Sequence, residues 1–289
     1  MEDLIEQVIH GLTLGSLYAM VAAGLALMFG VVRLVNFAHG EFYMLGGYAF
    51  WFAYRELGWP YPAAGIAAAL AMGGFGLLYE RCVIRAILLR PWQVQLVATL
   101  ATSITLTNVA IAVFGTQPRE APTPLSSAIV QIGGVRIAWH RVLVLGAACV
   151  IFAALQLFVA RAKLGRAMRA MSQNREACAV VGVDVQHVAL ATFGISAALA
   201  GLAAALVSPL FSIFPDVGAL LTLKAFAAVI VGGFGYVSGA IAASFLIGVA
   251  ESLAAGYVSY AYKDAIAFVV MILVLLIRPQ GLSGRRIGI

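Results

Sequence analysis

Charged residues are scarce in this chain of 289 residues. Lys, Arg, Asp and Glu together make up 10% of it, whereas a soluble domain carries roughly 25%. Hydrophobic residues make up 63%. So little charge excludes a soluble globular protein, and it predicts that membrane lipid is the main solvent of the folded chain.

Patterns typical of metal, redox and nucleotide sites are also absent. The three cysteines stand far apart without a Cys-x-x-Cys, and His39 has no second His or Cys nearby, so we predict no disulfide framework and no metal site. The four histidines form no set with a nucleophile, which argues against an enzyme. No Gly-x-x-x-x-Gly-Lys-Ser/Thr occurs, so we expect no ATP site and no cofactor in this chain. The basic residues form no single patch, which argues against nucleic acid as a partner.

Long apolar segments occupy most of the chain. A helix needs about 20 mostly apolar residues to cross a hydrocarbon core of ~30 Å, and the ten-residue alternation of a β-barrel is missing. The sequence therefore predicts an all-α, polytopic transmembrane helix bundle with broken helices, forming one domain over residues 1–289 with about eight passages, in a range of roughly seven to nine. The expected passages are 11–31, 42–57, 62–79, 94–115, 142–160, 188–212 and 264–278, with a glycine-broken stretch over 224–256. That stretch is either two short crossings or a re-entrant pair plus one full crossing.

Lys and Arg are shared unequally between the two sides of these segments. One set of connections holds 12 of them and the other set holds 6. Because cytoplasmic connections retain an excess of Lys and Arg, we assign the richer set to the cytoplasm. It includes the 161–187 connection and the C-terminal tail with Arg285 and Arg286, whereas Lys224 and the 116–140 loop fall on the other side. The acids near the N-terminus do not suit a secretory signal, so we expect the first span to be retained.

Three polar or ionisable residues interrupt the chain after the first apolar segment. Asn36, His39 and Glu41 leave no room for a conventional loop before the next segment. Position alone favours a tight cytoplasmic turn with Glu41 at the membrane interface. The alternative is a broken helix that lines a translocation path, because intramembrane ionisable residues are costly unless they face a cavity or a partner.

A second interruption lies at 231–239, where four glycines occur in eight positions, among them Gly232, Gly233 and Gly235. Each Gly costs about 1 kcal/mol relative to Ala in a helix interior, so the backbone must turn or open here. The stretch is either a hairpin between two short helices or a gate in the translocation path.

The longest connection assigned to the cytoplasm covers 161–187. Asn174 can cap a helix, Glu176 suits its first turn, and Gly182 can end it. We therefore predict a short amphipathic helix over 172–184. It is either an interfacial helix on lipid headgroups or a lever for a cytoplasmic partner.

Glu176-Ala177-Cys178-x-x-x-Gly182 resembles the Glu-Ala-Ala-x-x-x-Gly coupling loop of ABC importer permeases, with Cys178 in place of the second Ala. The resemblance implies that Arg175, Glu176, Ala177 and Gly182 contact an ATPase. Further blocks along the chain are similar to the LivH-type permeases of branched-chain amino-acid ABC transporters. These blocks are 11–16, 36–41, 165–169, 224–227, 232–235, and 262–265 with 278–281.

This resemblance implies a permease subunit of the bacterial cytoplasmic (inner) membrane. Its expected partners are a second, LivM-type permease, two ATP-binding subunits and a periplasmic solute-binding protein, and its expected cargo is branched-chain amino acids or related small solutes such as amides or urea. The main alternative is an ion-coupled secondary transporter, which needs paired carboxylates at the midplane. Only Glu251 lies well inside an expected span.

Overall fold

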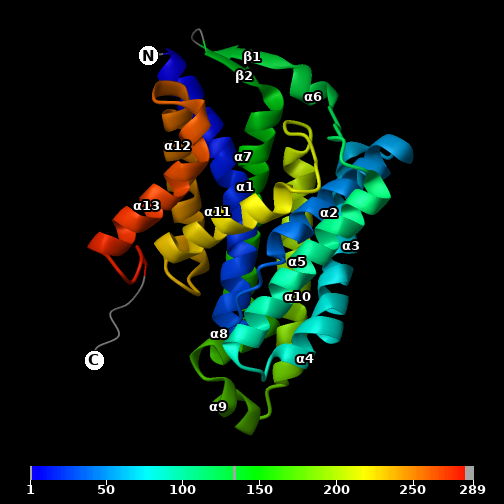
Figure 1. Ribbon diagram of the computed structural model, residues 1–289, viewed down its shortest axis with the longest axis vertical. Coiled ribbons are helices and arrows are strands. Elements are labelled where there is room, and N and C mark those ends of the chain that lie inside the picture. Colours follow the sequence, from blue (N-terminus) through cyan, green and yellow to red (C-terminus); the bar gives the residue numbers. More distant parts are fainter. Residues whose placement is uncertain (1, 133–134, 284–289) are drawn as a thin grey trace.

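The computed structural model describes residues 2–132 and 135–283, and these residues form a helical bundle with one β-hairpin at one end (Figure 1). Its elements are α1 (Glu2–Val32), α2 (His39–Trp51) with the π-helical turn η1 (Phe52–Glu56), α3 (Tyr61–Tyr79) with the π-helical turn η2 (Glu80–Ile84) and α4 (Arg85–Ile87), α5 (Trp92–Phe114), α6 (Pro124–Ser127), β1 (Ile129–Ile132), β2 (Val135–Ala138), α7 (Trp139–Arg161), α8 (Lys163–Gln173), α9 (Arg175–Val180), α10 (Val185–Val207), α11 (Val217–Gly232), α12 (Val237–Tyr257), the 3-10 turn η3 (Tyr260–Tyr262) and α13 (Lys263–Ile277).

Seven helices in the described part of the chain are long and apolar enough to cross a membrane. They are Asp3–Val32, Tyr61–Ile87, Trp92–Phe114, Trp139–Arg161, Val185–Val207, Val237–Tyr257 and Tyr260–Ile277. The predicted fold class is therefore confirmed, with the number of such helices at the lower end of the expected range. The segment expected at 42–57 corresponds to α2 and η1 and is not among the seven.

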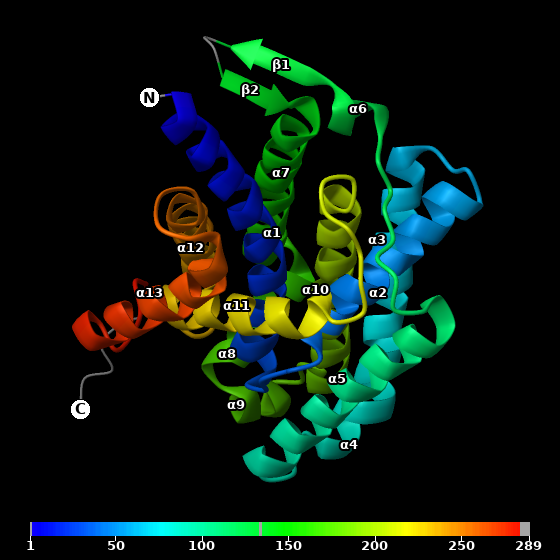
Figure 2. The same ribbon diagram turned by 45° about the horizontal axis from the view of Figure 1, so that its top comes forward.

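The glycine-broken stretch at 224–256 contains one short and one long helix. α11 has 16 residues, about 24 Å at 1.5 Å per residue, and it runs across the neighbouring helices instead of along them (Figures 1 and 2). α12 has 21 residues and reaches the length of a span. Two short crossings are therefore excluded.

Small residues allow close helix contacts in this bundle. α1 packs most extensively against α12, and a Cβ added at Gly11 would lie 2.6 Å from the Cα of Val249. α2 meets α10 in the same way, because a Cβ at Gly46 would lie 2.5 Å from the Cα of Gly201. Side chains at these positions would separate the helices.

The two ends of the bundle differ in structure. The N-terminus of α1 and the β1–β2 hairpin lie at one end, and α8, α9 and α4 lie at the other (Figures 1 and 2). This separation agrees with the assignment of the 116–140 and 161–187 connections to opposite sides. Arg285 and Arg286 lie outside the described residues. The assignment of Lys224 to an external connection is wrong, because Lys224 lies within α11 and is 4% exposed.

Candidate functional site

The 161–187 connection folds into two helices, α8 and α9, separated at Asn174. The prediction of one helix over 172–184 is therefore wrong in its extent. Asn174 has extended φ and ψ angles of −151° and 107°, and its Oδ1 accepts a hydrogen bond of 3.0 Å from the backbone N–H of Ala177. The predicted cap is confirmed, and Glu176 lies in the first turn of α9. A single residue thus ends α8 and begins α9.

Gly182 ends this segment with a φ of 84°, in the left-handed region that favours glycine. The Val183 N–H donates to the Cys178 carbonyl over 2.9 Å, which closes the turn. Nothing lies within 4 Å of a Cβ added at Gly182. A substitution there would strain the backbone without a steric clash, and the predicted helix stop is confirmed.

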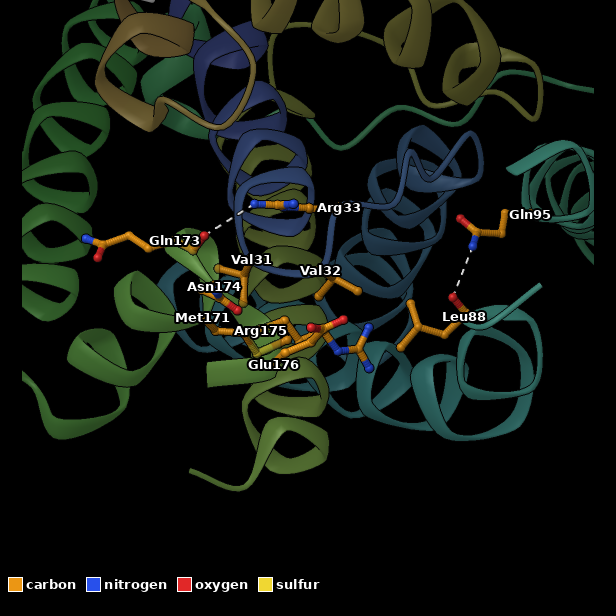
Figure 3. A pocket seen from close by; sticks show the side chains of 10 residues that line it. All are labelled: Val31, Val32, Arg33, Leu88, Gln95, Met171, Gln173, Asn174, Arg175 and Glu176. Carbon is orange, nitrogen blue, oxygen red and sulfur yellow. Dashed lines mark hydrogen bonds between the residues drawn. The ribbon is translucent and has the colours of Figure 1, made fainter. Parts of the chain in front are cut away.

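A cavity of about 440 Å³ lies beside α9 (Figure 3). Its walls come from the ends of α1 and α8, the start of α9, and the turn between α4 and α5. Arg175 and Glu176 line it on one side, and Leu88 and Gln95 line it on the other. The Gln95 Nε2 donates to the carbonyl oxygens of Leu88, at 3.1 Å, and Arg90, at 2.9 Å, and so holds the α4–α5 turn.

At the end of α9, two large apolar side chains are open to the surroundings. Val180 is 88% exposed and Val181 is 76% exposed. Contiguous apolar surface with polar residues at its rim is typical of interaction sites. Glu176 and Ala177 are exposed beside them, so α9 presents both charged and apolar groups outward.

Arg33 connects the α8–α9 segment to the first helix break. Its Nη2 donates to the carbonyl oxygens of Ser172, at 3.4 Å, and Gln173, at 3.5 Å, at the end of α8 (Figure 3 draws the second of these). A cation is favourable at a helix C-terminus. Arg33 has a φ of 59° and is the one non-glycine residue with positive φ in the described part of the chain. From the sequence we treated Arg33 only as a topology charge, because neither its backbone angle nor its distant contact leaves a sequence signal.

The break after Arg33 leads directly into the protein interior. Asn36, His39 and Glu41 are all 0% exposed, so the expected cytoplasmic turn with Glu41 at the interface is wrong. The break between α1 and α2 is buried, and its role in a translocation path stays a prediction. The Asn36 Oδ1 accepts hydrogen bonds from the Ala38 N–H, at 3.1 Å, and the Tyr79 hydroxyl, at 3.3 Å.

His39 and Glu41 are only partly satisfied. His39 Nε2 lies 3.1 Å from the carbonyl oxygen of Val21, and Glu41 Oε1 accepts from the Ser103 hydroxyl over 2.8 Å. His39 Nδ1 and Glu41 Oε2 have no partner among the described residues. Burying unpaired polar atoms costs free energy, so helix packing alone does not explain why His39 and Glu41 are buried here.

The glycines at 232–235 form the tight connection between α11 and α12. Gly233 and Gly235 have φ values of 103° and 80°, and a Cβ added at Gly232 would overlap the backbone of Gly239. A Cβ at Gly30, near the end of α1, would lie 3.1 Å from the Gly235 carbonyl oxygen. This connection therefore packs on the end of α1, and no hydrogen bond between described residues joins it to Asn36, His39 or Glu41.

A cluster of charges that was not predicted joins four helices. The Lys224 ammonium pairs with the carboxylate of Glu251 and, over 2.7 Å, with Asp264. The Tyr18 hydroxyl donates to Glu251 over 2.8 Å and accepts from Lys224 over 3.1 Å. The cluster connects α1, α11, α12 and α13. Ionisable residues in apolar segments are a sequence signal for buried ion pairs. The sequence does not show, however, that Lys224 and Asp264, 40 positions apart, are partners.

This architecture, with several apolar helices, buried helix breaks and an exposed two-helix segment at one end, is that of a multi-pass membrane transport subunit. The chain belongs to the family described as branched-chain amino acid transport system / permease component, whose model matches residues 7–275. This membership places it among permease components, which move solutes.

Curated relatives cover nearly the whole chain. The permease protein BraD of the high-affinity branched-chain amino acid transport system of Pseudomonas aeruginosa is 34% identical, over 97% of this chain and 96% of BraD. LivH of Escherichia coli is 30% identical, over 97% of this chain and 96% of LivH. LivM of Escherichia coli is 27% identical, over 93% of this chain and 68% of LivM. No solved structure gives a significant match.

Proposed function

We propose that this chain is a permease subunit of an ABC importer in a bacterial inner membrane, which moves branched-chain amino acids into the cytoplasm. The names of BraD and LivH support this cargo. ATP hydrolysis occurs on two partner subunits, a LivM-type chain is the second permease, and a periplasmic binding protein delivers the solute. The likeness to both LivH and LivM supports the pairing of two related permeases.

Arg175, Glu176, Ala177 and Gly182 form the contact with an ATP-binding subunit in this proposal. The observation that carries it is the link through Arg33, because a displacement of α8 and α9 pulls on the residue at which α1 breaks. Three residues later begins the buried polar stretch of Asn36, His39 and Glu41. Movement of the ATPase thereby reaches the interior of the bundle along the chain itself.

The translocation path in this proposal is bordered by Asn36, His39 and Glu41, and by the connection of Gly232, Gly233 and Gly235. Both sets lie next to the end of α1, one through the chain and one through the contact at Gly30. Unpaired polar atoms at His39 and Glu41 are available to a passing polar solute. Alternating access then requires only that the end of α1 shifts against α11 and α12.

The test compares two coupling variants with matched controls in the reconstituted transporter. Glu176→Lys reverses a charge worth roughly 0.3–1 kcal/mol at a helix N-terminus, and Gly182→Val strains a left-handed residue that has open space around it. Glu56→Lys and Gly58→Val are the controls, because Glu56 is exposed and Gly58 has a φ of 68° with nothing within 4 Å of an added Cβ.

We expect both coupling variants to insert normally but to lose leucine uptake, ATPase stimulation by the loaded binding protein, or co-purification of the ATPase. The controls should retain all three. Wild-type uptake by both coupling variants, with the ATPase fully bound, would show that this segment does not couple. Uptake that persists without the ATPase subunits and stops when ion gradients are dissipated would instead identify a secondary transporter.

A further inference from the structure

A second cavity, of about 460 Å³, lies away from the cytoplasmic segment. Leu14, Leu17 and Tyr18 line it from the middle of α1. Its other walls are Tyr43 of α2, the 211–217 connection, the first half of α11 and the start of α13. Its volume falls within the range of small-molecule sites, roughly 300–1,000 Å³, and its position halfway along the longest span is where transporters hold their cargo.

The walls of this cavity combine apolar surface with charges of both signs. Leucines from α1 and α11 and two phenylalanines from the 211–217 connection supply the apolar part. Lys224 and Asp264 also border it, but these two are paired with each other. Both already have partners inside the protein, in the cluster that also contains Glu251.

Asp216 and Lys263 differ from that pair. Both line the cavity, and within residues 2–132 and 135–283 neither belongs to an ion pair. Lys263 donates to the Tyr260 hydroxyl over 2.8 Å and lies over its ring at 4.1 Å, so an uncharged side chain holds the ammonium in place. Asp216 is exposed and Lys263 is partly exposed, so a ligand that enters the cavity can reach one carboxylate and one ammonium.

We propose that this cavity is a selective site for a zwitterionic amino acid with a branched aliphatic side chain. Asp216 takes the ammonium, Lys263 takes the carboxylate, and the side chain packs on Leu220, Leu221 and the leucines of α1. The inference rests on the proposed function and adds that the permease itself selects its cargo, in addition to any selection by a binding protein. A lipid acyl chain would fill only the apolar part and leave both charges unmatched.

The test measures leucine binding to the purified, assembled transporter without its binding protein. Radiolabelled leucine is the probe, and two analogues compete with it: 4-methylpentanoate, which lacks the ammonium, and 3-methylbutylamine, which lacks the carboxylate. We expect wild type to bind leucine and to prefer it to both analogues. Asp216→Asn and Lys263→Gln should each weaken leucine binding by about tenfold or more, the usual effect of losing a hydrogen bond to a charged group. Asp3→Asn and Arg55→Gln alter exposed charges elsewhere and should bind like wild type.

The analogues separate a specific role from general damage. Asp216→Asn should lose the preference for leucine over 4-methylpentanoate, and Lys263→Gln should lose the preference over 3-methylbutylamine. If the complete transporter imports leucine but the purified complex does not bind it, or if both variants bind and discriminate as wild type does, the cavity is not an amino-acid site and the proposed function stands. If the complete wild-type transporter imports no leucine at all, the proposed function itself fails.

Discussion

Replacement of Arg33 tests two physical consequences of its structure separately. A left-handed conformation costs a non-glycine residue roughly 1–2 kcal/mol, and Arg33 adopts a φ of 59°. Against this cost stand two long hydrogen bonds, of 3.4 and 3.5 Å, from an exposed guanidinium, which together contribute about 0.5–1 kcal/mol. Arg33→Gly removes both effects, so we expect the complex to be as stable as wild type or slightly more stable. Arg33→Ala removes the contacts and keeps the strain, so it should be about 1 kcal/mol less stable than Arg33→Gly.

Transport should respond differently from stability in these variants. Both Arg33→Gly and Arg33→Ala disconnect α8 from the break after α1, so both should lose most ATP-driven leucine uptake even though one of them is fully stable. Arg33→Lys retains a cation at the end of α8 and should retain part of the uptake. Thermal unfolding of the purified complex and uptake into proteoliposomes measure the two effects, with Arg55→Ala, at an exposed position in η1, as the control. Equal stability of the Gly and Ala variants would refute the strain argument, and wild-type uptake by Arg33→Gly would refute the mechanical link.

Three further predictions concern packing, charge and topology. Lys224→Met leaves the buried carboxylate of Glu251 in α12 without its cation. Thermal unfolding should show that the complex is less stable by about 3–5 kcal/mol. A Cβ at Gly40 would overlap the backbone of the first turn of α11, so Gly40→Ala should destabilise the complex by about 1–3 kcal/mol, whereas Gly74→Ala, with nothing within 4 Å, should not. In a background whose three cysteines are replaced by serine, Ser126→Cys should react with an impermeant thiol reagent added to intact cells, and Ser172→Cys should not.

Each of these predictions has a clear contrary result. Wild-type stability of Lys224→Met would mean that the carboxylate of Glu251 does not need its cation. Equal effects of the Gly40 and Gly74 variants would mean that close approach is not what requires glycine in α2. Labelling of both cysteines from outside would overturn the assignment of the two ends of the bundle to opposite sides.

Local features of the sequence predicted local features of the structure. Asn174 caps α9 and Gly182 takes a left-handed turn because both effects depend on the residue and its immediate neighbours. The fold class followed from composition and the length of the apolar segments, which depend on no particular contact.

Features that depend on distant partners were missed. Lys224 looked like a loop charge because a lysine inside a membrane helix is costly unless it is paired, and its partners at Glu251 and Asp264 lie 27 and 40 positions away. Arg33 gave no sign of its contact with α8, which lies 139 and 140 positions along the chain. Glu41 was placed at the interface because the sequence does not show that α5 and α11 cover it.

The packing of α1 also has a consequence for how the protein is made. α1 is the most enclosed of the seven long helices, because 89% of an apolar 18-residue stretch within it is buried. Its main partner is α12. Val237, at the start of α12, follows Val32 by 205 positions, which a ribosome working at about 5–20 residues per second covers in roughly 10–40 s. During that interval the side of α1 that contains Gly11 cannot pack on α12, and it contacts lipid or an insertion factor instead. Selection on the sequence of α1 therefore acts on two environments in succession, a lipid-exposed one during synthesis and an enclosed one in the finished protein.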